Sequence, residues 1–425
     1  MNTKFNTKHK SKQISQPKIC VENLVKIFGN RPREGLKLLR EGQSRDAILE
    51  QTGNIVGVGG VSFQIQEGEL FVIMGLSGSG KSTLIRCLNR LIEPTSGQVL
   101  IDDEDVAHVN LERLREVRRT KMAMVFQQFA LFPHLTVAEN TEYGLKVRGI
   151  DQQERRQKAL DTLEIVGLEK WANRYPSELS GGMQQRVGLA RALATDPDIL
   201  LMDEAFGALD PLIRRDMQAE LMRLQKELHK TVVFISHDIH EALKVGDRVA
   251  IMKDGCFVQV GTPEELVTQP ADNYIRDFMM DVNRAQVLKT GSITRKTIPV
   301  ILEQNTVQSA LEQMQQSQRE GIYIVNQHHS PLGFVTTQGL NQALKQGKEE
   351  LKSVMETDFP KVEASTTIEE VAHLCQQKLP LAIVNNQGEF QGIVEHSDIL
   401  ASIGSIKAVD EDTETEESQP QQLTV

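Results

Sequence analysis

The sequence predicts an α/β protein with a largely parallel sheet, followed by a smaller α+β unit that is duplicated. From residue 69 to about residue 270, short apolar runs alternate with amphipathic helical segments, which is typical of a parallel sheet with crossover helices. After about residue 282, one order of helix, strand, turn, strand and helix occurs twice. A chain of 425 residues is long enough for two or three domains.

The composition is that of a soluble protein and argues against nucleic acid as a partner. Charged residues make up 25% of the chain and hydrophobic residues 39%, the usual balance of globular proteins. The net charge of −10 and the aromatic content of 4% do not favour a surface for phosphates and stacked bases. Because no apolar run reaches the roughly 18 residues of a membrane span, any action on a membrane needs another chain to cross it.

The two ends of the chain differ in charge from each other. Residues 1–17 are basic and residues 406–425 are acidic, and we expect both to be disordered tails. Residues 18–28 alternate apolar and polar side chains, as in an edge strand, and residues 33–52 carry a charged helical pattern that predicts an inserted helical segment. Apolar runs predict further strands at 61–66, 69–74, 122–126, 199–202 and 231–235.

A glycine-rich stretch directly follows the apolar run 69–74. Residues 75–83 read G-x-x-x-x-G-K-S-T and lead into a helical segment. Glycines let backbone N–H groups turn toward phosphate oxygens, and the helix start adds its positive dipole end. We expect Lys81 to reach the β- and γ-phosphates of ATP and Ser82 to bind Mg²⁺. The alternative, a glycine-rich turn without a ligand, is disfavoured by the strand before it and the helix after it. The candidate ATP-binding residues of this loop are Gly75, Leu76, Ser77, Gly78, Ser79, Gly80, Lys81, Ser82 and Thr83.

Two adjacent carboxylates, Asp203 and Glu204, follow the apolar run 199–202. In parallel sheets, ligands bind at the carboxyl ends of the strands, where these side chains would lie. We expect Asp203 to hold Mg²⁺ and Glu204 to act as the general base toward the attacking water. Alone, the pair fits an acidic turn or a helix cap equally well; together with residues 75–83 it favours nucleotide hydrolysis.

Four more motifs carry a family resemblance. Residues 179–185 read LSGGMQQ and lead into a helical segment, which resembles the signature sequence of ABC transporter ATPases. Gln127 matches the family's Q-loop glutamine, Ala208-Leu209-Asp210 its D-loop and His237 its switch histidine. All the motifs occur in the family's order between residue 18 and about residue 270.

The resemblance implies a fold and a trans arrangement of the site. It implies a P-loop NTPase domain with a mixed sheet over residues 18–280, with a helical subdomain at about 125–195. Phe28 would stack on adenine, although the inserted segment separates it from residues 75–83. Two identical chains would sandwich ATP between the phosphate loop of one and the signature of the other, a homodimer. The signature residues are Leu179, Ser180, Gly181, Gly182 and Gln184.

Three further roles follow from the same resemblance. Gln127 would touch Mg²⁺ and the attacking water, and His237 would contact the γ-phosphate. The segment 128–145 would dock on a transmembrane permease subunit. Its closely spaced apolar residues, Phe129, Leu131, Phe132 and Leu135, are expected to be exposed, although an ordinary apolar loop would carry the same pattern.

Within this family the chain is most similar to the ATPases of bacterial glycine betaine/proline-type importers. The insertion between Phe28 and the next strand, the text around residues 71–103 and 114–145, and the duplicated unit carry this similarity. It implies uptake of a compatible solute such as glycine betaine, proline betaine, choline or proline, in osmoprotection. The chain would lie on the cytoplasmic face of the bacterial membrane, with a permease and a substrate-binding protein as partners.

Other functions remain as alternatives. An importer ATPase for an amino acid or a polyamine would share every motif, because partner proteins recognise the cargo. A soluble ABC ATPase of DNA repair or of ribosomes usually carries two cassettes or long coiled-coil insertions, and this chain has one cassette. A regulatory protein with an inactive cassette is disfavoured by the intact Lys81, Asp203 and Glu204.

The duplicated unit resembles a tandem pair of CBS domains, about residues 282–345 and 350–405. Such pairs often bind the ribose of an adenosine-containing ligand with a hydroxyl residue followed three positions later by Asp. The first half has Thr336 but Gly339, and the second has Asp398 but Glu395, so neither is complete. The pair is interpreted either as a structural dimerising module or as a sensor of ionic strength or of an adenine nucleotide.

Overall fold

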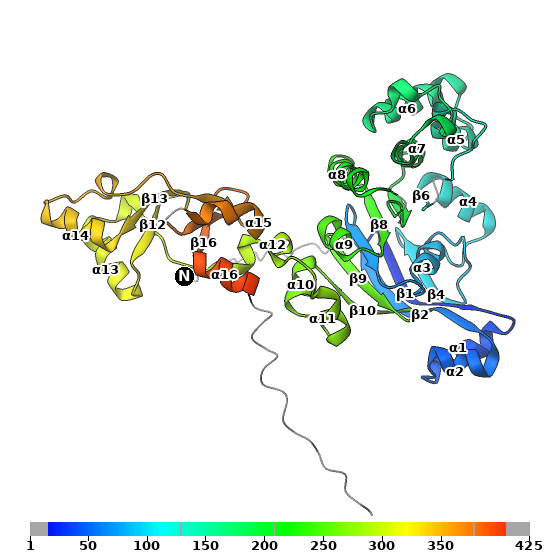
Figure 1. Cartoon of the computed structure of the whole chain (residues 1–425), viewed down its shortest axis with the longest axis horizontal. Helices are drawn as coiled ribbons and strands as arrows, with labels where there is room; N and C mark the ends of the chain where they lie inside the picture. The colour runs from blue at the N-terminus through cyan, green and yellow to red at the C-terminus, as the bar shows by residue number, and fades with distance from the viewer. Residues whose placement is uncertain (1–15, 128–129, 208, 377–378, 405–425) are drawn as a thin grey trace, which may run out of the picture. The chain divides into compact units, whose positions relative to one another are not determined.

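The structure is a computed structural model that describes residues 16–127, 130–207, 209–376 and 379–404. Contacts within the chain divide it into two compact units, Met1–Val282 and Asn283–Val425, and each is described by itself (Figure 1). Nearly all of the predicted basic tail and all of the acidic tail lie outside the described residues.

Within the described ranges, six strands form the main sheet of the first unit. All of them run parallel except β10, which pairs antiparallel with β9 at one edge. Every residue of β3, β7 and β8 is buried, because these unbroken apolar runs form strands that are covered on both faces. Across the sheet the strands are β10 (Cys256–Gly261), β9 (Arg248–Lys253), β3 (Leu70–Met74), β8 (Thr231–Ser236), β7 (Ile199–Asp203) and β6 (Met122–Val125).

A second, antiparallel sheet contains the first strand of the chain. Its order is β2 (Ile55–Ile65), β1 (Ile19–Phe28), β4 (Ser96–Ile101) and β5 (Glu104–Asp105). The prediction of an edge strand at residues 18–28 is therefore wrong, since β1 pairs with a neighbour on each side. Alternating side chains report that one face of a strand is solvated, and an interior strand of an antiparallel sheet has such a face as well.

Helix α3 (Lys81–Leu88) lies between the two sheets. Its buried residues Leu84, Ile85 and Leu88 belong to one apolar cluster with Val21 of β1 and Phe71 of β3. The helix contacts strands of both sheets, so its N-terminus has a defined position relative to both. This N-terminus follows directly on the predicted phosphate loop.

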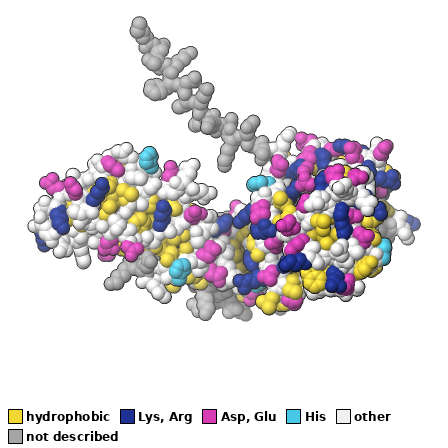
Figure 2. Space-filling view, turned by 90° about the horizontal axis from the view of Figure 1, so that it is seen from above, with side chains coloured by type: hydrophobic (Ala, Val, Ile, Leu, Met, Phe, Trp, Pro, Cys, Tyr) yellow, Lys and Arg dark blue, Asp and Glu magenta, His cyan; other side chains and the backbone are white. Residues whose placement is uncertain are grey.

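The other helices of the first unit cover the sheets and form a separate helical layer. The helices α5 (Val137–Val147), α6 (Gln152–Ile165) and α7 (Gly181–Leu193) pack on one another around a core of their own (Figure 1). The remaining helices and 3₁₀ turns of this unit are α1 (Pro32–Arg40), α2 (Arg45–Thr52), α4 (Leu111–Thr120), η1 (Glu169–Trp171), η2 (Pro176–Glu178), α8 (Pro211–Leu228), α9 (Ile239–Val245), α10 (Pro263–Thr268) and α11 (Asn273–Met279). On the right of Figure 2, acidic and basic side chains lie interspersed over the surface of this unit.

The predicted inserted helical segment forms two short helices, α1 and α2. It leaves the antiparallel sheet after Phe28 and returns at Ile55, and these two residues pair with each other across β1 and β2. The insertion is thus an elaborated hairpin loop that does not interrupt the sheet.

The second unit contains the predicted duplication. Each half has a short strand that pairs in parallel with a second strand, followed by an antiparallel hairpin. The first half contains β11 (Val300–Ile301), η4 (Leu302–Gln304), α13 (Val307–Ser317), β12 (Gly321–Val325), β13 (Pro331–Thr336) and α14 (Thr337–Lys345). The second half contains β14 (Lys361–Glu363), α15 (Ile368–Val371), η6 (Ala372–Gln376), β15 (Leu381–Val384), β16 (Phe390–Val394) and α16 (His396–Gly404). Connecting turns are α12 (Arg284–Val287), η3 (Thr290–Ile293) and η5 (Leu351–Ser353).

An aromatic cluster joins the two halves. Tyr323 of the first half, which is 1% exposed, packs against Phe334 and against Phe390 of the second half. Its hydroxyl donates a hydrogen bond of 2.6 Å to the carbonyl oxygen of Pro380. A second hydrogen bond, of 2.8 Å, runs from the Phe390 N–H to the carbonyl oxygen of His329. The halves are therefore held together by apolar burial and by polar contacts that bridge the repeat.

The Tyr323→Phe variant tests this contact. The substitution keeps the ring but leaves the half-buried Pro380 carbonyl without this donor, so we expect the second unit to lose about 1 kcal/mol of unfolding free energy. Urea unfolding followed by circular dichroism measures the loss, while fluorescence of Trp171, which lies in the first unit, should keep its midpoint. Tyr274→Phe is the matched control, because the buried Tyr274 hydroxyl has no hydrogen-bond partner among the described residues. Equal midpoints for wild type and Tyr323→Phe would contradict the prediction.

Candidate functional site

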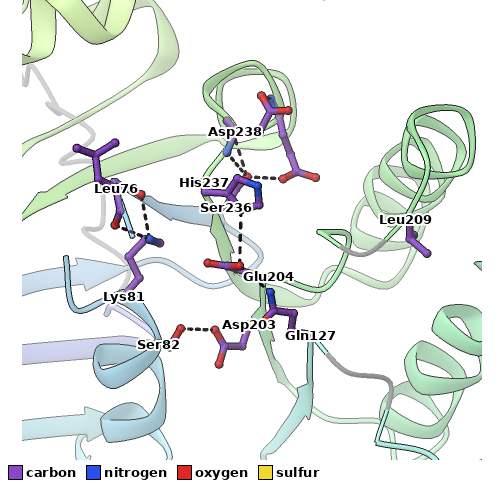
Figure 3. A network of polar contacts seen from close by, with 12 residues as sticks. Leu76, Lys81, Ser82, Gln127, Asp203, Glu204, Leu209, Ser236, His237 and Asp238 are labelled. Carbon is purple, nitrogen blue, oxygen red and sulfur yellow. Dashed lines mark hydrogen bonds and ion pairs between the residues drawn. The ribbon is translucent and has the colours of Figure 1, made fainter. Parts of the chain in front are cut away.

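Four parallel strands end at the same edge of the main sheet, and each is followed by a predicted site residue. The phosphate loop follows β3, Gln127 follows β6, Asp203 and Glu204 lie at the end of β7, and His237 follows β8. Figure 3 shows these side chains converging from neighbouring elements. The carboxyl ends of a parallel sheet therefore bring together motifs that are far apart in the chain.

The phosphate loop is packed too closely for side chains at two of its glycines. A Cβ on Gly75 would lie 2.1 Å from the carbonyl oxygen of Met252, and one on Gly80 would lie 2.2 Å from that of Gly57. Gly80 also has φ +105 and precedes the first residue of α3. Glycine is required at both positions because the loop backbone lies directly against β2 and β9.

Lys81 is a buried cation within this loop. Its side chain, in a residue only 5% exposed, donates hydrogen bonds of 2.9 Å to the Gly75 carbonyl and 3.0 Å to the Leu76 carbonyl (Figure 3). Burial lowers the pKa of Lys81, while the negative charges of Glu204 and Asp203 oppose this shift. A bound polyanion would stabilise the charged form further, so the ammonium suits a phosphate ligand.

Asp203 has two partners on the same face of α3. It accepts a hydrogen bond of 2.9 Å from the Ser82 hydroxyl, and its other oxygen lies 3.0 Å from Arg86 Nη2. The Asp203 side chain is 4% exposed, so the Arg86 cation stabilises a carboxylate that is largely removed from water.

Glu204 has a separate pair of partners. The Gln127 amide nitrogen donates a hydrogen bond of 2.9 Å to Glu204 Oε2, and His237 Nδ1 lies 3.6 Å from the same oxygen (Figure 3). The Glu204 backbone has φ +46, a region that non-glycine residues rarely adopt. Such a conformation at the end of a buried strand often marks a functional position.

The turn that carries His237 is fixed by a buried polar network. The Ser236 hydroxyl donates to Glu241 and accepts from the Asp238 backbone N–H at 3.0 Å. Glu241 also accepts a hydrogen bond of 3.0 Å from Gln218 of α8, and burial raises its pKa. The position of His237 is therefore tied to both α8 and α9.

A cleft of about 290 Å³ lies beside these residues. Phe28, 38% exposed, and Ile55 line it together with the phosphate loop, although the insertion separates them in sequence. Gln127, Asp203 and His237 are not among the lining residues. Gln127 and His237 contact Glu204, and Asp203 contacts Ser82, both of which line the cleft. The lining residues are Phe28, Arg45, Ile55, Gly57, Ser77, Gly78, Gly80, Lys81, Ser82, Thr83 and Glu204.

Some predicted site residues do not line this cleft. Ser180 caps α7, where its hydroxyl accepts from the Met183 N–H at 3.4 Å, and Gln184 donates to the Pro176 carbonyl at 2.9 Å. Asp210 caps α8 by accepting from the Ile213 N–H at 3.2 Å. Leu179, Gly181 and Gly182 belong to the same turn and helix start, and Gly182 lies against Ile213. Ala208 lies outside the described residues.

Comparisons with known proteins identify the family. The model described as "ABC transporter" matches residues 58–207. The chain is 46% identical to "Glycine betaine transport ATP-binding protein OpuAA" of Bacillus subtilis, over 91% of this chain and 92% of that protein. It is 50% identical to "Glycine betaine/proline betaine transport system ATP-binding protein ProV" of Salmonella typhimurium, over 91% and 97%. The chain belongs to the ABC transporter ATP-binding proteins.

Further matches agree with this assignment. The model described as "CBS domain" matches residues 351–405 of the ABC protein. A solved structure titled as a dimeric, post-hydrolysis state of the ATP-binding cassette MJ0796 bound to ADP and Pi matches with a TM-score of 0.50 and 36% identity, covering 58% of this chain and 98% of that one. The family resemblance and the α/β fold class predicted from the sequence are confirmed. Among the described residues, no helix combines the length and apolar character that a bilayer-spanning segment needs.

The predicted docking segment of the ABC protein is only partly exposed. Phe129 lies outside the described residues, whereas Leu131, Phe132 and Leu135 are half-buried. The prediction that all of them are exposed is therefore wrong for these three. Leu131 packs on the core of α5–α7, and Asn140 holds the loop by donating to the Phe132 and Leu135 carbonyls at 3.0 Å each.

The two positions considered for a ribose ligand are engaged within the second unit. The Thr336 hydroxyl accepts from the Gly339 N–H at 3.1 Å and caps α14. Asp398 accepts hydrogen bonds from Arg295, at 2.9 Å from Nε and 2.5 Å from Nη2, and Arg295 Nη1 also reaches Glu395 at 3.2 Å. The carboxylate considered for ribose binding is thus paired with a cation of its own unit.

Two residues of the site were not predicted from the sequence. Arg86 follows Ser82 by four positions on α3, so helix spacing would have placed it on the same face. Arg45 comes from the insertion, and nothing in the local pattern indicates that it lines the cleft.

The donors near Asp203 fit a magnesium ion. Mg²⁺ prefers hard oxygen ligands and takes one or two from the protein, with phosphate and water supplying the rest. The Ser82 hydroxyl and the Asp203 carboxylate lie side by side, and Gln127 reaches the adjacent Glu204. This donor set has the chemistry that a Mg²⁺–nucleotide complex requires.

Lys81→Ala tests the phosphate loop. Removing the buried cation takes away the positive charge nearest the loop carbonyls, and we expect tight MgATP binding to be lost. A titration with a fluorescent ATP analogue measures this, with Lys244→Ala on the exposed side of α9 as the control. If Lys81→Ala binds ATP as tightly as the wild type, residues 75–83 do not form the phosphate site.

Proposed function

We propose that this chain is the ATP-hydrolysing subunit of an ABC importer that takes up glycine betaine and related compatible solutes. The observation that carries the proposal is the convergence of Lys81, Asp203 and Glu204 at one edge of the main sheet. The names of OpuAA and ProV, to which the chain is similar over nine-tenths of its length, support the solute class.

The phosphate loop would hold the nucleotide. Backbone N–H groups of residues 75–83 and the start of α3 favour an anion at this point, and Lys81 adds a charge that would exchange its carbonyl partners for phosphate oxygens. Phe28, which also lines the cleft, offers an aromatic face for adenine. Ser82, Asp203 and Gln127 would hold Mg²⁺, which neutralises phosphate charge during transfer.

Glu204 would act as the general base. Its carboxylate would accept the proton of a water whose oxygen attacks the γ-phosphorus, while the bond from that phosphorus to the β–γ bridging oxygen breaks and ADP leaves. Gln127 and His237, which both approach Glu204 Oε2, would orient that water and contact the γ-phosphate. The strained Glu204 backbone supports this role, since its side chain is held toward the cleft at a cost in conformational energy.

The competent site would form between two copies of the chain. Leu179, Ser180, Gly181, Gly182 and Gln184 surround the N-terminus of α7, which favours an anion but does not line the cleft of its own chain. In a homodimer these residues and Asp210 would approach the partner's nucleotide. The dimeric state of the MJ0796 cassette structure supports this arrangement.

The membrane-spanning work would belong to other chains. We propose a transmembrane permease and a substrate-binding protein as partners, with this subunit peripheral at the cytoplasmic face of the bacterial membrane. The segment 128–145 would contact the permease. Within this segment, the Asn140 side chain donates to the Phe132 and Leu135 carbonyls, which would fix the shape of the loop that meets the permease.

Glu204→Gln tests the chemistry. The amide keeps the size of the side chain but cannot accept a proton, so we expect ATP binding to persist and phosphate release to fall by roughly 10²–10⁴-fold. Phosphate release by the purified chain, at a protein concentration that allows dimers, measures it. The matched control is Glu112→Gln, an exposed position on α4. Turnover within a few-fold of wild type would show that Glu204 is not the base.

The cargo is tested in cells. A strain that lacks this chain, complemented with wild type or Glu204→Gln, is assayed for uptake of labelled glycine betaine, proline and putrescine at high osmolarity. We expect the strain complemented with the wild type to take up glycine betaine, and the strain complemented with Glu204→Gln to take up none. Restored uptake of putrescine without glycine betaine would overturn the proposed solute class but leave the ATPase assignment intact.

A further inference from the structure

The insertion between β1 and β2 is firmly attached to the sheet. Asn54, which is 1% exposed, donates hydrogen bonds of 2.9 Å to the Arg31 carbonyl and 2.8 Å to the Thr52 hydroxyl. Ile48 of α2 is fully buried in a cluster that includes Ile27 and Val56. Because both its ends and its inner face are fixed, α2 has a defined orientation relative to the cleft.

This orientation brings Arg45, the first residue of α2, to the nucleotide cleft. Arg45 lines the cleft together with Phe28 and the phosphate-loop residues Ser77 and Gly78. Its side chain is 27% exposed. Lys81 lines the same cleft, so Arg45 adds to the positive charge of a site for a highly charged anion.

The present partner of Arg45 is a solvent-exposed carboxylate. Arg45 Nη1 lies 3.3 Å from Asp254 Oδ1, and the Asp254 side chain is 73% exposed. Ion pairs with so exposed a partner contribute little to stability, because water competes for both charges. The guanidinium can therefore leave Asp254 for a stronger anion at small cost.

Asp254 belongs to a turn that supports the phosphate loop. The N–H of the next residue, Gly255, donates a hydrogen bond of 2.9 Å to the Ser79 carbonyl, and the Gly255 carbonyl accepts one of 2.9 Å from Gly59. The Arg45 guanidinium thus lies between the insertion and the turn beside the phosphate loop, within the wall of the cleft itself.

We propose that Arg45 is a nucleotide-binding residue, supplied by the insertion, that exchanges Asp254 for phosphate oxygens of bound ATP. A guanidinium presents a planar fork of donors that matches phosphate geometry. The inference rests on the proposed function, because it assigns a further contact to the same nucleotide. It also gives the insertion a role in nucleotide binding. The packing of the insertion on the sheet does not by itself require such a role.

Substitutions of the two members of the ion pair are expected to affect ATP affinity differently. Arg45→Ala removes the phosphate contact, and we expect ATP affinity to fall about tenfold. Asp254→Asn removes the competing carboxylate and keeps a residue type that tolerates the local φ of +50. In this variant ATP affinity should be unchanged or up to a few-fold higher.

The measurement uses the full chain in a Glu204→Gln background, with isothermal titration of MgATP and of inorganic tripolyphosphate. Arg40→Ala, an exposed residue at the end of α1, controls for the loss of a positive charge in the insertion. Weaker binding of both probes by Arg45→Ala alone supports the proposal. Equal weakening by Arg45→Ala and Asp254→Asn would show that the ion pair is only a structural clasp and would overturn it.

Two further outcomes are separable. If Arg45→Ala weakens ATP but not tripolyphosphate, the guanidinium contacts the nucleoside and the phosphate assignment is wrong. If the Glu204→Gln parent itself binds no ATP, the proposed function fails; if the parent binds and Arg45→Ala binds equally well, only this inference fails. Thermal unfolding of each variant confirms that the insertion remains folded.

Discussion

The close packing of backbone on backbone at the start of α3 is the constraint on which the rest of the site depends. The phosphate loop lies against the carbonyl oxygens of Gly57 and Met252, one in each sheet, with no room for a Cβ at Gly80 or Gly75. Since α3 is also buried between the two sheets, the loop has a fixed position relative to β7 and β8. Asp203 at the end of β7 can therefore accept a hydrogen bond of 2.9 Å from Ser82 of the loop.

Charge is distributed in this site so that each ionised group has its own polar partner. Lys81 is solvated by loop carbonyls, Asp203 by Ser82 and Arg86, and Glu204 by Gln127 and His237. Burying the same charges without partners would lower the stability of the fold, because each would lose its hydration with nothing to replace it. The same arrangement leaves each group able to exchange a protein partner for a nucleotide, a metal ion or water, because the replacement contacts are at least as strong as those they displace.

The insertion and the second unit are additions to this core, and both reuse simple packing rules. The insertion grows from a hairpin whose strands still pair at Phe28 and Ile55, so the sheet tolerates it. The second unit repeats one small α+β element. The apolar residues that one copy would expose by itself are buried against the other copy, in the cluster around Tyr323. A single element of that size could not bury enough apolar surface alone.

The sequence by itself determined the elements that local patterns report. Unbroken apolar runs predicted β3, β7 and β8, and the glycine and acidic motifs at their ends predicted the phosphate loop, Asp203 and Glu204. Local patterns could not place β1 inside its sheet. The alternation of apolar and polar side chains shows that one face of a strand is solvated, but it does not show how many strands pair with it. They also missed the half-buried Leu131 and the approach of Arg45 to the cleft. Those features were decided by the tertiary structure alone, since each depends on contacts between segments whose distance in space is unrelated to their distance along the chain.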